Sequence, residues 1–163
     1  VASLFVMLYI IYAFRNVEQS YIYALAAILT LIHDVLVVMG LFILISIFMG
    51  SVVNSIFIVG ILTVIGYSVN DTIVIFDRIR ENLLVNKSME FMNVVNQSVK
   101  ESITRSLGTS ITTSIVILSM LLFGGQSLRD FLLVLLLGVI IGTYSSIFVA
   151  SNLLLSWKYG IRK

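Results

Sequence analysis

Apolar residues are gathered into five long stretches, which short clusters of charged and polar residues separate. A helix rises about 1.5 Å per residue, so about 20 residues cross the hydrocarbon core of a bilayer. Four of the five stretches reach that length, and they do not alternate as strands do. The pattern predicts an all-α integral membrane protein, a polytopic bundle of transmembrane helices. The predicted helices cover residues 1–14, 21–47, 55–76, 104–123 and 131–155.

The composition agrees with a bilayer as the surrounding solvent. Hydrophobic residues make up 60% of the 163 residues, charged residues make up 11%, and the mean hydropathy is +1.12. Soluble proteins carry about a quarter charged residues. The net charge of +2 is too small to indicate a nucleic-acid partner, and no cysteine and one histidine are too few for a structural metal site. We expect neither a metal ion nor a cofactor.

Basic residues fall almost entirely on one side of the predicted bundle. If the stretches cross the membrane in turn, nine of the ten Lys and Arg residues share one side, and only Arg129 is on the other. Cytoplasmic loops carry an excess of basic residues, so that side, which includes the C-terminus, is predicted to be cytoplasmic. The sequence begins at Val1 within an apolar stretch and has no basic leader. We therefore expect a longer natural protein that is truncated here at its N-terminus.

The charged connection before the fourth span contains a helical pattern of its own. Met92, Val95, Val99 and Ile103 recur at helical spacing, and polar residues take the opposite face. This predicts an amphipathic cytoplasmic helix over residues 89–103. Such a helix either lies along the membrane interface or packs against the bundle, and the pattern alone leaves both arrangements open.

Three ionisable residues, Asp34, Asp71 and Arg105, fall inside predicted spans. Each costs about 2.5–3.5 kcal/mol at the centre of a membrane helix, so such residues usually face protein and have a function. A carboxylate whose contact with a guanidinium can form and break is suited to take up and release a proton. We therefore expect a proton relay of Asp71, Arg105 and Asp34. The alternative is structural: an Asp–Arg pair that joins two helices, or an arginine that only anchors a helix end.

Small and polar side chains recur at helical spacing along three spans, and such stripes mark the faces that turn toward protein. A charged pair between two such stripes would find hydroxyl groups there to complete its hydrogen bonds. The stripes comprise Gly60, Thr63, Gly66, Tyr67, Asn70 and Asp71 on the third span, Ser102, Arg105, Ser106, Thr109, Thr112 and Thr113 on the fourth, and Gly138, Gly142, Ser146 and Ala150 on the fifth.

Within these stripes, two groups of residues have distinct expected roles. The side chains of Asn70, Thr109 and Tyr67 are expected to support the relay. Glycines four residues apart let neighbouring helices approach closely. The glycines expected to serve helix packing are Gly66, Gly138 and Gly142.

The segment Leu62–Asn82 reads LTVIGYSVNDTIVIFDRIREN. It resembles the signature of the SecF subunits of the bacterial Sec export machinery, in which a GYSxNDT core precedes VxFDRIRE. Further resemblances are HDV at His33–Val35, the run from Arg105 to Thr113, LFGG, and GTYSS at Gly142–Ser146. The resemblance implies a transmembrane domain of the resistance-nodulation-division type. It also implies that a first span and a large outer domain precede the present sequence.

Membership of this family would imply an auxiliary subunit of the Sec translocase that uses the proton-motive force to promote protein export, and not an enzyme. The implied partners are SecD, separate or fused in one polypeptide, the SecYEG channel, the exported preprotein and the lipid bilayer. The implied location is the bacterial cytoplasmic (inner) membrane. The family's intramembrane Asp falls on Asp71 and its Arg on the next helix falls on Arg105, whereas the role of Asp34 in the HDV motif is less defined.

Other functions remain open from the sequence. One is a small-molecule, proton-coupled exporter of the same superfamily. Another is an intramembrane aspartyl protease in which Asp34 and Asp71 share a proton, although the GxGD motif of such proteases is absent and the sequence here reads YSVND. A membrane scaffold without transport activity is the third alternative.

Overall fold

The structure is a computed structural model that describes residues 12, 20–50, 53, 55–86 and 88–160. Regular structure in this part of the chain is entirely helical, and four helical stretches are long and apolar enough to cross a membrane, which confirms the predicted fold class. The helix expected over residues 1–14 lies outside the described residues, except for Tyr12. The elements are α2 (Ser20–Met49), α3 (Ser55–Val85), α4 (Phe91–Phe123), η1 (Gln126–Leu128), α5 (Arg129–Ser145), η2 (Ser146–Ala150) and α6 (Ser151–Gly160).

Glycines end two of the long helices. Gly50, directly after α2, has a φ of 66°, a left-handed conformation that glycine adopts without a steric penalty. Its N–H donates to the carbonyl oxygen of Ser46 at 2.9 Å. At the end of α4, the N–H of Gly124 donates to the carbonyl oxygen of Met120 at 2.8 Å. A Cβ on Gly124 would lie 2.2 Å from that oxygen, so only glycine fits there.

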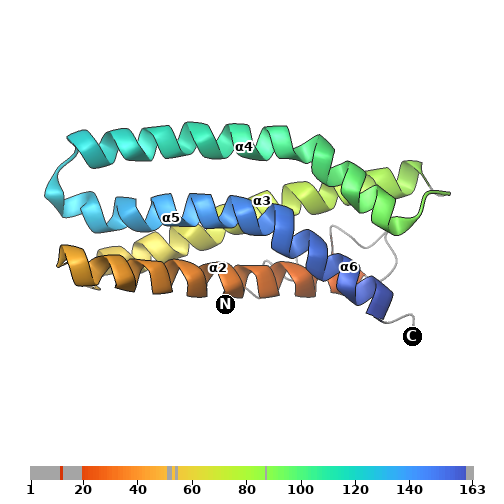
Figure 1. The fold of residues 1–163 in the computed structure, drawn as a ribbon, viewed down its shortest axis with the longest axis horizontal. Helices are drawn as coiled ribbons and strands as arrows, with labels where there is room; N and C mark the ends of the chain where they lie inside the picture. The colour runs from red at the N-terminus through yellow and green to blue at the C-terminus, as the bar shows by residue number, and fades with distance from the viewer. Residues whose placement is uncertain (1–11, 13–19, 51–52, 54, 87, 161–163) are drawn as a thin grey trace.

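Short connections make consecutive long helices antiparallel, and α5 takes the central position. Helix α5 contacts α2, α3 and α4. Figure 1 shows α5 lying between α4 and α2, with α3 behind them. The single helical rod formed by α5, η2 and α6, here called the central rod, therefore touches every other long helix in the described part of the chain.

The described residues form three buried apolar clusters, and a polar layer lies between two of them. On α2 the order along the helix is Ala27 of the first cluster, then the buried Asp34, then Val38 of the second cluster. A polar layer of this kind is stable only if its groups find hydrogen-bond partners, because burial of an unpaired polar group is costly. The first cluster is built on Tyr23, Ala27, Phe76, Ile79, Ile147 and Leu154, and the second on Val38, Phe42, Phe57, Val64 and Val134.

Helices α3 and α4 extend well beyond the predicted spans. Helix α3 continues to Val85 and α4 already begins at Phe91, so the separate amphipathic helix predicted over residues 89–103 is instead the first part of α4. The 31 residues of α3 and the 33 residues of α4 measure about 47 and about 50 Å, against about 30 Å of hydrocarbon. Their paired ends therefore continue beyond the bilayer.

Contacts between the two extensions explain why α4 is continuous. Asn82 Nδ2 donates to Ser98 Oγ and to Glu101 Oε2, both at 2.9 Å, and Arg78 Nε donates to Glu101 Oε2 at 2.6 Å. Val95, one turn before Ser98 on the same face of α4, is buried in the first apolar cluster. The segment thus packs against the bundle, the second of the two arrangements that the pattern left open.

Candidate functional site

Asp34 lies in the polar layer and is completely buried, with 0% of its surface exposed. Its Oδ2 accepts a hydrogen bond from Ser145 Oγ at 2.7 Å and another from Ser68 Oγ of α3. Its Oδ1 lies 3.0 Å from Nδ1 of the adjacent His33. These partners offset the loss of water around the carboxylate. Asp34 is therefore held by side chains of the bundle itself.

Asp71 lies on α3, one turn after Ser68, and is partly buried. Its Oδ1 accepts a hydrogen bond from Ser106 Oγ of α4 at 2.7 Å, and its Oδ2 accepts one from Ser146 Oγ at 2.5 Å. Unlike Asp34, it also lines a cavity of about 110 Å³ between α3 and α4. Asp71 therefore joins three helices and is reached by open space.

Two consecutive serines of the central rod serve two different carboxylates. Ser145 ends α5 and donates to Asp34 of α2, whereas Ser146 begins η2 and donates to Asp71 of α3. Consecutive residues of a helix point about 100° apart, so side chains of one turn can donate hydrogen bonds to two neighbouring helices. Element η2 is a π turn, a widened helical turn that is frequent at functional sites.

Arg105 lines the same cavity as Asp71 but does not contact it. Among the described residues, no carboxylate lies within 4.0 Å of its guanidinium, and the residue is exposed. A second cavity, of about 260 Å³, is lined by the charged ends of α3 and α4 and shares Val74 and Arg105 with the first. Arg105 therefore shares a cavity with Asp71 and forms no direct ion pair with it.

The predicted supporting side chains all line this cavity, but they differ in what they bind. Tyr67 Oη lies 3.2 Å from Ser110 Oγ of α4, and Ser110 in turn shares a hydrogen bond with Thr143 Oγ1. Thr109 is exposed, and its hydroxyl donates to the carbonyl oxygen of Arg105 in its own helix at 2.9 Å. Asn70 is exposed at the rim. Of these three residues, only Tyr67 therefore links neighbouring helices.

Two of the three predicted packing glycines lie at close helix contacts. A Cβ on Gly138 would lie 2.1 Å from Val64 Cγ2, and a Cβ on Gly142 would lie 3.3 Å from Ser68 Cβ. Gly66 differs, because a Cβ there would meet nothing within 4 Å. Gly66 therefore makes no close helix contact within the described residues, because it lies outside the face of α3 that packs against the other helices.

The orientation of α3 also explains which residues the sequence patterns missed. Ser68 and Ser145 hold Asp34, yet neither belongs to a predicted stripe, although they lie in the GYS and GTYSS motifs. The useful signal was the spacing of Ser68 three residues before Asp71, which puts both on one helix face. The buried face of α3 includes Gly60, Val64, Ser68 and Thr72, whereas Thr63, Gly66 and Asn70 of the predicted stripe are exposed.

The two carboxylates have separate sets of partners. Within the described residues, no hydrogen bond joins Asp34 to Asp71. An aspartyl-protease dyad shares one proton between two adjacent carboxyl groups, so this arrangement does not support that function. No group of three or more His, Cys, Asp or Glu residues in the described ranges could hold a metal ion.

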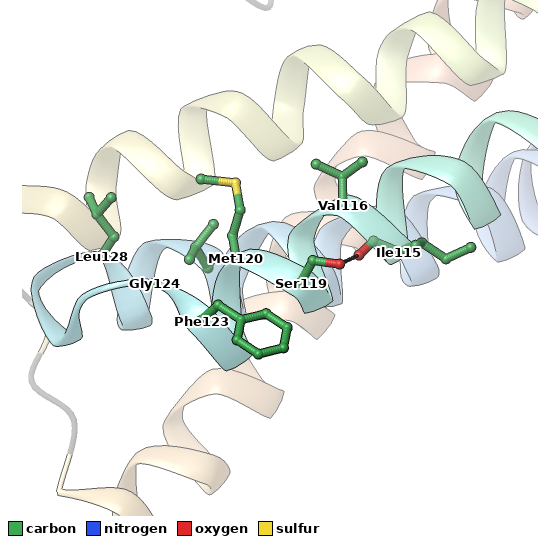
Figure 2. A pocket seen from close by; sticks show the side chains of 8 residues that line it. Ile115, Val116, Ser119, Met120, Phe123, Gly124 and Leu128 are labelled. Atoms are coloured by element: carbon green, nitrogen blue, oxygen red, sulfur yellow. Dashed lines mark hydrogen bonds between the residues drawn. The ribbon is translucent and has the colours of Figure 1, made fainter.

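Two hollows elsewhere on the bundle present an almost entirely apolar surface. Figure 2 shows one of about 470 Å³ near the turn from α4 to α5, where Phe123 is 89% exposed. Its one hydroxyl, on Ser119, donates its proton to the carbonyl oxygen of Ile115 at 2.8 Å. The other, of about 390 Å³, lies between α4 and the α5–η2 rod. Such surfaces are expected where helices face lipid, and they contain no candidate chemistry.

Known proteins share both this sequence and this fold. The family described as "Protein export membrane protein SecD/SecF, C-terminal" matches residues 1–160. The protein translocase subunit SecF of Thermobaculum terrenum is 46% identical over 157 residues, which are 96% of this chain and 50% of that protein. SecF of Anaerolinea thermophila is 42% identical over 161 residues, 98% of this chain and 52% of that protein. The chain thus spans about half the length of these relatives.

Solved structures of SecDF match the helical bundle. The crystal structure of SecDF in its super-membrane-facing form has a TM-score of 0.84 and 38% identity, covering 96% of this chain and 20% of that one. SecDF from Thermus thermophilus, described as a translocon-associated membrane protein, has a TM-score of 0.81 and 39% identity, covering 94% of this chain and 20% of that one. On this sequence identity and this fold, the chain belongs to the SecF subunits of the SecD/SecF family of protein-export membrane proteins.

Proposed function

We propose that the protein is a SecF-type auxiliary subunit that uses the proton-motive force to promote protein export, with Asp71 as the group that takes up and releases the proton. The observation that carries this proposal is the setting of Asp71, which accepts hydrogen bonds from Ser106 and Ser146 and also lines a cavity of about 110 Å³. Intramembrane carboxylates that face a bundle interior commonly act as proton carriers. The cavity supplies a route for the proton, and the hydroxyls stabilise the charge.

Arg105 is the second member of the proposed relay. Its guanidinium lines the cavity of Asp71 and has no ion-pair partner among the described residues. When it moves toward Asp71 it favours the charged carboxylate, and when it moves away it favours the protonated acid. Asp34, completely buried and bound by Ser68 and Ser145, is the third member and holds the central rod in register with α2.

A homologous SecD chain is the proposed partner of the exposed polar face of α3 and α4. Asn70 and Arg105 are exposed on spanning helices, and neither side chain has a hydrogen-bond or ion-pair partner in the described part of the chain. Polar groups that face hydrocarbon are costly, so a protein surface is expected to cover them. The similarity to structures named SecDF supports SecD, separate or fused, as that surface.

The wider setting follows from the family and the charge pattern. The proposed location is the bacterial inner membrane with the C-terminus in the cytoplasm, supported by the side that holds nine of the ten basic residues. Further proposed partners are the SecYEG channel and the exported preprotein. Identities of 42% and 46% to SecF subunits favour this role over a small-molecule exporter.

The test is Asp71→Asn in the full-length protein. Asn keeps the shape, accepts a hydrogen bond from one of the two serines through its oxygen and donates to the other through its NH2 group, but it does not take up a proton. We expect preprotein export into inverted membrane vesicles to lose its dependence on an imposed proton gradient, while the protein still co-purifies with SecD.

The matched control is Asp77→Asn, the same change on the same helix. Asp77 is exposed and pairs with Arg80 at 3.1 Å, outside the cavity of Asp71. We expect this variant to export like the wild type. Gradient-dependent export by Asp71→Asn at the wild-type level would show that the proton is carried elsewhere.

A further inference from the structure

Each of the two serines has a second acceptor in its own helix. Ser145 Oγ lies 2.7 Å from Asp34 Oδ2 and 3.2 Å from the carbonyl oxygen of Gly142. Ser146 Oγ lies 2.5 Å from Asp71 Oδ2 and 3.2 Å from the carbonyl oxygen of Thr143. A hydroxyl has one proton to donate, and the charged carboxylate is the stronger acceptor. The helix carbonyl is therefore a ready alternative when the carboxylate stops accepting.

Protonation of Asp71 would exchange these partners. The acid would donate its new O–H to Ser146 Oγ, and Ser146 would donate its own proton to the carbonyl oxygen of Thr143. Every donor and acceptor stays satisfied, so the exchange is not opposed by an unpaired group. The same exchange is available to Asp34, Ser145 and the Gly142 carbonyl. Each serine thus has two discrete hydrogen-bonded states.

The two exchanges take place on adjoining residues of one turn. Ser145 and Ser146 are consecutive, and the π turn Ser146–Ala150 begins at the second of them. Any displacement of this turn moves both hydroxyls together. The central rod also contacts α2, α3 and α4, so a displacement of the turn changes its packing against the helices that hold both carboxylates.

We propose that Ser145 and Ser146 are positioning residues that link the protonation of Asp34 to that of Asp71 through the turn at which α5 passes into η2. The inference rests on the proposed function, in that it takes Asp71 to be the proton carrier, and it adds the means by which the second carboxylate senses the first. Coupling of this kind needs a two-state element that both sites bias, and the exchange of hydroxyl partners is that element.

Other titratable and charged groups face the two carboxylates. His33 lies on the same helix as Asp34, with Nδ1 3.0 Å from Oδ1. Tyr67 of α3 and Arg105 of α4 line the cavity of Asp71. A test must therefore separate the serine link from these groups, and removal of the serine hydroxyls alone does so.

The experiment is infrared difference spectroscopy of the full-length protein in lipid, with Asp34→Asn and Asp71→Asn used to assign each carboxyl band. We expect Ser146→Ala to shift the band of Asp71 and also that of Asp34, and Ser145→Ala to shift both bands as well. Ser146→Cys keeps nearly the same shape with a weaker donor and should give smaller shifts of both bands. This variant keeps the test valid if an alanine variant does not fold.

Ser151→Ala is the matched control, because Ser151 is also buried on the same rod and its hydroxyl has no hydrogen-bond partner in the described residues. It should shift neither band. If Ser146→Ala or Ser146→Cys moves only the Asp71 band, the two carboxylates are independent and the proposal is wrong. Export measured in parallel distinguishes failure of the proposed function from failure of the serine link. Gradient-dependent export by Asp71→Asn would refute the proton-carrying role of Asp71, whereas the shifts of the Asp34 and Asp71 bands test the link between the two carboxylates.

Discussion

Gly138 is a site at which one added methyl group should separate two helices. In the structure, a Cβ on Gly138 would lie 2.1 Å from Val64 Cγ2, 2.7 Å from Val64 Cγ1 and 2.9 Å from Val64 Cβ. Rotation of Val64 about χ1 moves the two methyl groups but leaves its Cβ in place. Since even that atom is closer than a normal contact, Gly138→Ala requires α3 and α5 to move apart.

The expected cost can be estimated from the two effects that oppose each other. Overpacking in a well-packed core costs about 1–3 kcal/mol. Replacement of a mid-helix glycine by alanine returns up to about 1 kcal/mol of helix propensity. With the full gain of about 1 kcal/mol, the net change for Gly138→Ala is therefore a destabilisation of about 0–2 kcal/mol. Gly40→Ala, where a Cβ would meet nothing within 4 Å, has only the favourable effect.

The assay is denaturant-induced unfolding of the full-length protein in mixed micelles, followed by helical circular dichroism. We expect Gly138→Ala to unfold at lower denaturant than the wild type, and Gly40→Ala to unfold at the same or higher denaturant. A double-mutant cycle with Val64→Ala adds specificity. Removal of the two valine methyl groups should relieve the two shortest contacts, leave only the 2.9 Å contact with the Cβ of residue 64, and give a coupling energy of about 0.5–3 kcal/mol.

The reasoning would be refuted if Gly138→Ala and Gly40→Ala had equal stability. It would also be refuted if the effects of Gly138→Ala and Val64→Ala were simply additive, because that result would mean that the two residues do not meet. Either outcome would place the α3–α5 contact elsewhere.

Two further predictions concern the polar contacts. Asn82→Ala removes the donor to Ser98 and Glu101, which should cost about 1–3 kcal/mol and speed amide hydrogen exchange over residues 91–101. Asn96→Ala, an exposed change on α4, should leave that exchange unaltered, and equal exchange in both variants would contradict the role of Asn82. Arg105→Lys should reduce gradient-dependent export although it keeps the charge, because an ammonium lacks the planar fork of donors; Arg129→Lys is its control, and equal export by the two would mean that charge alone suffices.

Much of the architecture follows from the sequence. The lengths of the apolar stretches predict the spanning helices, because a helix is the element that satisfies its own backbone in lipid. The cost of charge in hydrocarbon singles out Asp34, Asp71 and Arg105. The signature in Leu62–Asn82 predicts the family. The extra length of α3 and α4 was missed, because charged residues mark the end of a span and not the end of a helix.

Only the tertiary structure decided which polar residues meet. Periodicity shows that a helix has a polar stripe, but the angle at which that stripe faces a neighbour depends on how the other helices pack. The buried face of α3 therefore includes Ser68 rather than Gly66. The bonds from Ser145 to Asp34 and from Ser146 to Asp71 join residues 111 and 75 positions apart. No local pattern specifies such pairs, because the π turn and the close approach of α3 to α5 at Gly138 bring them together in space.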